Sequence, residues 1–204
     1  MLIVTLPVGY LETNCYIVTD EETLKCAIID PGADSNTILD YIESNKLKPE
    51  AIFVTHGHFD HIMALDAVMD ETSAPAYINK KEAPISIHKK AKISDTLPKL
   101  RSYAEGDVIK VGALEFTVYE TPGHSLDSVT LKCGAALFTG DTLFRDSCGR
   151  TDLEGGDMEV LLNSLRRLSE MEGDYEVYPG HAGSSTLNRE RSFNYYMKYA
   201  NNER

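Results

Sequence analysis

The chain has 204 residues, a formal net charge of −12 and a hydrophobic fraction of 42 %. This length suffices to bury a substantial core, and we expect one domain that spans residues 1–204. The acidic balance argues against a nucleic-acid partner, because phosphate backbones require compensating lysines and arginines. The lack of a long uncharged apolar stretch argues against a membrane helix.

The first half of the chain alternates predicted strands and helices. Apolar runs predict strands at residues 2–6, 15–19, 26–29, 51–54 and 75–78. The turn at Asp30-Pro31-Gly32 follows the third strand. Apolar stripes at helical spacing predict one helix with Asp34 or Ser35 as its N-cap, and a second helix that begins near Asp60.

Residues 79–105 show no regular pattern, and we expect a helical excursion or a lid there. The part from Lys80 to Arg101 is basic. We interpret it as a solvated helical face, and the alternative is a patch that attracts an anionic small substrate. His88 lies in this part, and we expect its side chain to be exposed.

The second half repeats the order of strands followed by a helix. It contains two predicted hairpins, 108–111 with 114–119 and 128–132 with 136–139, which turn at Gly112 and Gly134. An amphipathic helix at 158–168, a last strand at 175–178 and a closing helix at 187–199 follow. The likeness of the two halves predicts an α/β fold with two sheets and outer helices, a four-layer αβ/βα sandwich.

The cysteines form no C-x-x-C pair, and we expect free thiols in a reducing cytosol. Cys148 lies in a glycine-rich loop near Asp141. We interpret it as a packing residue and not as a catalytic thiol, because no histidine is near it in the sequence. The N-terminus lacks the basic leader of a signal peptide, so we expect a cytoplasmic protein. The cysteines are Cys15, Cys26, Cys133 and Cys148.

Seven metal-competent side chains follow predicted strands. Loops at one end of a sheet converge, so these side chains can meet although they are far apart in the sequence. Imidazole and carboxylate groups suit zinc, iron or manganese. A structural zinc site is disfavoured, because such sites close with four ligands that often include cysteine. The seven are His56, His58, Asp60, His61, His124, Asp141 and His181.

The spacing of these residues predicts two divalent ions, with zinc as our first choice. Residues i and i+2 of an extended segment point the same way, so His56 and His58 can hold one ion, joined by His124. Asp60 and His61 stand where a helix begins and can face a second ion together with His181. Asp141 can bridge the two ions. The net positive charge of such a site lowers the pKa of bound water toward neutrality.

The H-x-H-x-D-H pattern at 56–61, with the later His, Asp and His, resembles the metallo-β-lactamase superfamily. The segments 121–125 (T-P-G-H-S) and 138–144 (F-T-G-D-T-L-F) are similar to motifs of its glyoxalase II branch. The run 149–157 looks closest to short bacterial glyoxalase II-like hydrolases. The resemblance implies an αβ/βα sandwich with metals at one edge, and it implies that Arg150 contacts the glycine carboxylate of glutathione.

The chain departs from the glyoxalase II pattern at three places. Met63-Ala64 and Asp127 stand where glycines are common, and Asp152 stands where full-length glyoxalase II has a glutathione-contacting tyrosine. These departures put glutathione specificity in doubt, while thioester hydrolysis stays compatible with the pattern.

We therefore expect a dinuclear metal-dependent hydrolase that acts on a small-molecule thioester such as S-lactoylglutathione. Asp60 orients the attacking hydroxide, and Arg150 pairs with a substrate carboxylate. One alternative is a mononuclear iron persulfide dioxygenase, whose triad would be His56, His124 and Asp141. The pattern is also compatible with phosphodiester or lactone hydrolysis and with a non-catalytic metal-binding protein.

Overall fold

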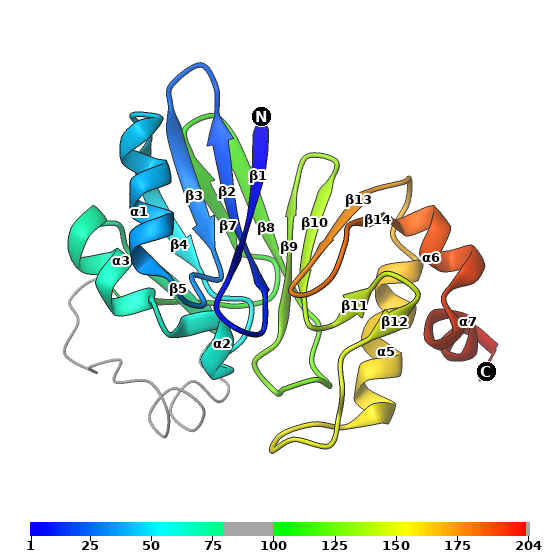
Figure 1. Ribbon diagram of the computed structural model, residues 1–204. Coiled ribbons are helices and arrows are strands. Elements are labelled where there is room, and N and C mark those ends of the chain that lie inside the picture. The colour runs from blue at the N-terminus through cyan, green and yellow to red at the C-terminus, as the bar shows by residue number, and fades with distance from the viewer. Residues whose placement is uncertain (80–99, 203–204) are drawn as a thin grey trace.

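The computed structural model describes residues 1–79 and 100–202, and the first half forms a six-stranded sheet (Figure 1). The first three strands pair antiparallel, and β3 to β6 pair parallel. Parallel neighbours need crossover connections, which explains why helices alternate with strands here. In sheet order the strands are β1 (Leu2–Val8), β2 (Thr13–Asp20), β3 (Lys25–Ile29), β4 (Lys48–Phe53), β5 (Ala76–Asn79) and β6 (Leu100–Tyr103). The helices are α1 (Ser35–Ser44), α2 (Phe59–Ile62) and α3 (Leu65–Thr72).

The second half forms another six-stranded sheet, mostly antiparallel, with β10 and β13 as a parallel pair that α5 connects. A separate two-stranded ribbon joins β11 (Leu143–Phe144) to β12 (Ser147–Cys148). In sheet order the strands are β14 (Ser185–Thr186), β13 (Glu176–Pro179), β10 (Ala136–Gly140), β9 (Val129–Cys133), β8 (Leu114–Glu120) and β7 (Val108–Val111). The helices are α5 (Met158–Ser169), α6 (Leu187–Phe193) and α7 (Tyr195–Asn202).

The two sheets pack face to face, with α1 and α3 on one outer side and α5, α6 and α7 on the other (Figure 1). The period of two along a strand divides its side chains between two cores. On β2, Tyr16 and Val18 enter the core between the sheets, while Cys15 and Ile17 face the helices α1 and α3. This arrangement is the predicted four-layer αβ/βα sandwich.

Most strands and the helices α1 and α5 agree with the prediction, whereas the helix from Asp60, the closing helix and the irregular segment differ from it. The expected helix from Asp60 is two helices, which break at Met63-Ala64. The closing helix is also two, because Asn194 adopts extended backbone angles and donates its side-chain amide to Phe144 and Ser147 carbonyls. A further strand, β14, follows the strand that we expected to be last.

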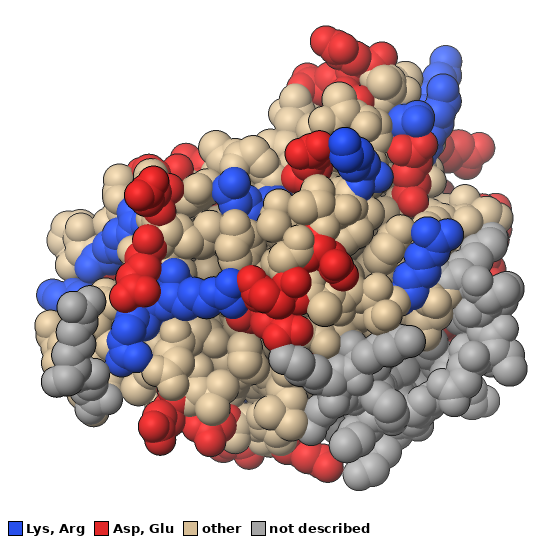
Figure 2. Space-filling model, turned by 180° about the vertical axis from the view of Figure 1, so that it is seen from behind, with Lys and Arg blue, Asp and Glu red and all other residues tan. Residues whose placement is uncertain are grey.

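The segment 79–105 contains β6, which pairs parallel with β5, so the expectation of a helical excursion or lid is wrong for residues 100–103. Residues 80–99 of that prediction, which include Lys80 and His88, lie outside the described residues. Arg101 is exposed and donates a hydrogen bond to the Tyr77 hydroxyl. On the face shown in Figure 2, lysines and arginines alternate with acidic side chains over the part that the structure describes.

Asp34 occupies the N-cap position of α1, but its carboxylate does not cap that helix. It accepts a hydrogen bond from the Gly9 amide at 2.8 Å instead. The four cysteines are free, as predicted. Burial raises the pKa of the Cys148 thiol to about 11, so this thiol is protonated and inert at neutral pH. Within the described residues, 1–79 and 100–202, no helix is both long enough and apolar enough to cross a membrane.

The core between the sheets should dominate the stability of the fold. Phe53 is fully buried there, with its ring centroid 4.9 Å from that of Phe116. We expect Phe53→Ala to lower the free energy of unfolding by about 3–5 kcal/mol, because it removes apolar contacts and leaves a cavity. Phe193→Ala is the matched control, since that ring is 70 % exposed, and it should cost less than about 1 kcal/mol. Urea denaturation measures both, and equal losses would contradict this account.

Candidate metal centre

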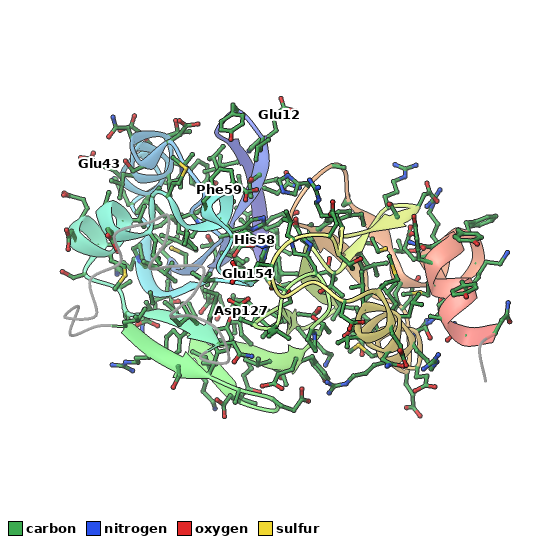
Figure 3. All side chains as sticks on the ribbon, turned by 90° about the horizontal axis from the view of Figure 1, so that it is seen from below. Glu12, Glu43, His58, Phe59, Asp127 and Glu154 are labelled. Carbon is green, nitrogen blue, oxygen red and sulfur yellow. The ribbon has the colours of Figure 1, made fainter. Side chains whose placement is uncertain are left out.

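The seven predicted side chains lie together at one end of the two sheets, where Figure 3 labels His58 near the centre. The loop after β4 carries the first four, and α2 begins at Phe59 within it. His124 follows β8, Asp141 follows β10 and His181 follows β13. Because β10 and β13 are parallel, their carboxyl ends meet at the same edge, which brings Asp141 and His181 together.

The ligand atoms form three overlapping groups, in each of which all atoms lie within 4.8 Å of one another. The first and the last have the memberships that the spacing predicted, and the middle group contains the predicted bridge, Asp141. One carboxylate oxygen of Asp141 is 3.4 Å from His61 Nε2, and the other is 3.5 Å from Nε2 of both His124 and His181. The groups are His56, His58 and His124; His56, His61 and Asp141; and Asp60, His61 and His181.

The outer nitrogen of most of these imidazoles is held by a protein oxygen. His61 Nδ1 lies 2.9 Å from Asp30 Oδ2, and His124 Nδ1 lies 2.7 Å from the Arg150 carbonyl oxygen. His181 Nδ1 lies 3.2 Å from the Leu11 carbonyl oxygen. Such acceptors place the N–H on Nδ1 and direct the lone pair of Nε2 inward.

His56 and His58 complete the arrangement in different ways. The Thr55 hydroxyl donates to Asp30, so its oxygen is free to accept from His56 Nδ1 at 3.1 Å. His58 instead turns Nδ1 inward, to 2.8 Å from His124 Nε2. Two imidazole nitrogens at this distance need a shared proton or a cation between them.

Three buried polar atoms at the centre of the cluster have no hydrogen-bond partner: His56 Nε2, His61 Nε2 and Asp141 Oδ1. Leaving such atoms unpaired is costly, at about 1–3 kcal/mol each. Their residues form the middle of the three groups, and imidazole and carboxylate are good ligands for zinc, iron or manganese. The donor set therefore fits two divalent cations.

The electrostatics separate the histidines into two kinds. Burial, reinforced by the neighbouring imidazoles, lowers the pKa of His56 well below its usual value and that of His58 to about 4. Burial acts in the same sense on His61, but the Asp141 and Asp30 carboxylates outweigh it and raise its pKa. The hydrogen bond to Asp60 raises the pKa of His181. His61 and His181, whose pKa values are raised, therefore bind protons in the absence of cations.

The carboxylates are ionised. Burial favours the neutral acid at Asp60, but the hydrogen bond with His181 and the charge of His61 lower its pKa. The same contest, with His61 as the main opposing charge, lowers the pKa of Asp141. Both side chains are thus ready to bind a cation.

Sequence reasoning missed two carboxylates that support the cluster. Asp30, which we predicted only as part of a turn, accepts from the Thr55 amide and hydroxyl, both at 2.7 Å, and faces His61. Its backbone adopts a positive φ of 52°. A turn that follows a strand of the same sheet is the one signal that could have found it.

Asp127, noted only as a departure from the glyoxalase II pattern, is also buried beside the site, where Figure 3 labels it. It accepts from the Gly57 amide at 2.8 Å and from the Ser125 hydroxyl at 2.8 Å. Burial raises its pKa. It fixes the peptide between His56 and His58, a contact that no local sequence pattern indicates.

The structure brings only the backbone of Arg150 to the cluster. Its carbonyl oxygen faces His124, but its guanidinium is exposed and makes two hydrogen bonds of 2.6 Å to Asp152. Arg150 thus forms the predicted pair of hydrogen bonds to a carboxylate, but the carboxylate is that of Asp152 in the same loop.

Gly180 allows the side chains of Asp141 and His61 to lie close to its backbone. A Cβ atom at this residue would lie 2.2 Å from Asp141 Oδ1 and 2.7 Å from His61 Cε1. We expect Gly180→Ala to lower metal affinity at least about tenfold, because both side chains must shift. Gly183→Ala is the control, since a Cβ there meets nothing within 4 Å. Chelator competition with elemental analysis measures both, and equal affinities for the two variants would contradict the prediction.

The lowered pKa of His58 makes the metal-free protein sensitive to acid. A depressed pKa contributes stability that is present above the unfolded value of 6.5 and is lost as the pH falls toward about 4. We expect the wild type to lose about 2 kcal/mol more than His58→Gln over this range. Urea denaturation of both proteins without metal, at pH 7 and pH 4, tests it. Parallel losses would show that His58 is not the titrating group.

Comparisons with known proteins agree with this architecture. The family model "Metallo-beta-lactamase superfamily" matches residues 8–181. The chain is 34 % identical to the probable metallo-hydrolase YqgX of Bacillus subtilis, covering 94 % of this chain and 95 % of that one. It is also 34 % identical to a hydroxyacylglutathione hydrolase of Psychromonas ingrahamii, where the match covers 85 % of this chain but 62 % of the relative.

Solved structures resemble the chain over nearly its whole length. The B3 metallo-beta-lactamase BLEG-1 superposes with a TM-score of 0.85 at 32 % identity, covering 96 % of this chain and 99 % of that one. TTHA1623 in a di-iron-bound form gives 0.82 at 34 % identity, covering 96 % and 100 %. ETHE1 from Myxococcus xanthus gives 0.81 at 28 % identity, covering 99 % and 91 %. The chain belongs to the metallo-β-lactamase superfamily.

Proposed function

We propose that the protein is a dinuclear metal-dependent hydrolase of small thioesters, of the glyoxalase II type. The observation that carries this proposal is the position of Asp141, whose two oxygens face His61 on one side and His124 and His181 on the other. A carboxylate placed so can serve two cations at once. Two divalent ions, zinc first and iron or manganese otherwise, would lower the pKa of bound water and polarise a carbonyl oxygen.

The groups on the chain supply orientation and a hydrogen-bond acceptor. Asp60 Oδ2 lies 3.1 Å from the Thr13 hydroxyl, which donates to it, and 3.2 Å from His181 Nε2. Its lowered pKa keeps Asp60 ionised, so its carboxylate can accept a hydrogen bond from the attacking water and orient that water. The half-buried Cys148, with a raised pKa, is unsuited to act as a nucleophile.

Thioesters are the favoured substrates for two reasons. The motifs around His124 and Asp141 are similar to those of glyoxalase II, and one relative bears the name hydroxyacylglutathione hydrolase. Arg150 would bind a substrate carboxylate only by leaving Asp152, so glutathione dependence rests on that exchange. The free cysteines fit a reducing compartment, which is why we place the reaction in the cytoplasm.

A mononuclear iron persulfide dioxygenase is the second candidate. The geometry allows it, because the His56 and His124 ring centroids are 4.9 Å apart and Asp141 lies beside His124. This function would use three of the seven side chains, and it leaves the group of Asp60, His61 and His181 without a role. One iron per chain together with oxygen uptake would favour it over thioester hydrolysis.

Asp60→Ala tests the proposal. We expect purified wild-type protein to carry two metal ions per chain and to hydrolyse members of a panel that includes S-lactoylglutathione and acyl-CoA thioesters. The variant should lose at least about a hundredfold in kcat/KM, because removal of Asp60 takes away both a ligand and the group that directs water.

Asp40→Ala, on the exposed side of α1, is the matched control and should keep full activity. Circular dichroism checks that both variants fold. Unchanged turnover in Asp60→Ala would refute the assignment, and so would the failure of a fully metallated wild type to cleave any thioester.

A further inference from the structure

A cleft of about 270 Å³ lies beside Asp60. The β1–β2 loop forms one wall, and the turn between β3 and α1 forms the other together with α2 and the residue that follows it. Figure 3 labels Phe59, the first residue of α2, beside the β1–β2 hairpin that carries Glu12. The apolar residues that line this cleft are Val8, Tyr10, Leu11, Ala33, Phe59 and Met63.

The inner end of the cleft reaches the candidate metal centre. Thr13 and Asp60 both line it, and the Thr13 hydroxyl donates to Asp60 Oδ2 at 3.1 Å. The same oxygen lies 3.2 Å from His181 Nε2, within the group of Asp60, His61 and His181. A thioester whose carbonyl carbon meets water beside Asp60 therefore has its acyl substituent at the inner end of the cleft.

We propose that this space, which we name the acyl cleft, binds the acyl chain of the thioester and selects uncharged, apolar acyl groups of about four to six carbons. The size follows from the volume, because a dry apolar cavity of about 150 Å³ already holds benzene. The inference rests on the proposed function, since it assigns the acyl half of that substrate.

The charges at the cleft explain why the acyl group is uncharged. Its two charged lining groups are the carboxylates of Asp60 and Asp34, and the latter accepts a hydrogen bond from the Gly9 amide at 2.8 Å. No lysine or arginine is among the described residues that line it. A dicarboxylic acyl group would bring a third negative charge between apolar walls, whereas an alkyl chain only exchanges water for apolar contact.

A series of thioesters on one thiol carrier tests the inference by kinetics. From acetyl to hexanoyl, kcat/KM should rise about fourfold for each methylene and then level off. The succinyl thioester should react at least about tenfold more slowly than the butyryl thioester. A flat profile from acetyl to hexanoyl, with thioesters still cleaved, would overturn the acyl cleft and leave the proposed function standing.

Ala33→Leu should fill the cleft and lower the ratio of hexanoyl to acetyl kcat/KM at least about tenfold. The matched control is Ala113→Leu, because Ala113 is exposed in the β7–β8 turn. The Ala113 amide donates to Asp20, which ends β2, whereas Thr13 at the start of β2 lines the cleft. If Ala33→Leu does not fold, Met63→Ala replaces it. This variant widens the exposed side of the cleft and should move the optimum to longer chains. The same change of ratio in Ala113→Leu would contradict the assignment.

Binding provides a readout that needs no turnover. Calorimetry with acetate, butyrate and hexanoate should show affinity rising about fourfold per methylene in the wild type, and no rise in Ala33→Leu. Such a gradient in a protein that cleaves no thioester would support the cleft as a site for apolar chains while the proposed function fails. Equal affinities for the three acids would contradict the proposed binding of apolar chains in the acyl cleft, whichever substrate the enzyme hydrolyses.

Discussion

The site depends on one repeated interaction, the hydrogen bond from the outer nitrogen of an imidazole to a protein oxygen. Asp30, Leu11 and the Arg150 carbonyl hold His61, His181 and His124 in this way. Each bond fixes the ring and, in the neutral imidazole, the tautomer, so the inner nitrogen of the neutral ring presents a lone pair. The acceptors come from loops of both sheets. Of the three bonds, the one between His181 and the Leu11 carbonyl joins loops of the two sheets, so a shift of one sheet against the other would turn His181 away from the centre.

This arrangement has a cost that the rest of the fold must offset. Three buried atoms at the centre lack partners, and like groups crowd together, as His58 and His124 do at 2.8 Å. Such features destabilise a protein without bound ions. The compensation lies in three apolar cores, one between the sheets and one under each helical layer. The rigid interior thus allows an edge of the sandwich to remain unsatisfied until a cation binds.

The sequence was informative where one periodicity or one chemical type decides the outcome. Apolar runs located the strands, and the seven side chains were predicted to meet because each follows a strand. It failed where distant contacts decide. The β6 strand has an irregular burial pattern and forms because β5 offers it an edge. Asp30 contacts His61, which is 31 residues away in the sequence, and Asp127 accepts a hydrogen bond from Gly57, which is 70 residues away. No local pattern carries that information.

The loops around the centre divide their work between backbone and side chain. In the β1–β2 loop the Leu11 carbonyl holds His181, while the Leu11 side chain lines the acyl cleft. Across the site, the Arg150 carbonyl holds His124, while its side chain is exposed and pairs with Asp152. A substitution at either residue keeps the carbonyl and changes only the side chain beside the centre. Relatives as different in name as a B3 metallo-beta-lactamase and a hydroxyacylglutathione hydrolase resemble this chain, and a fold whose loops divide these two tasks can change the loop side chains while it keeps its centre.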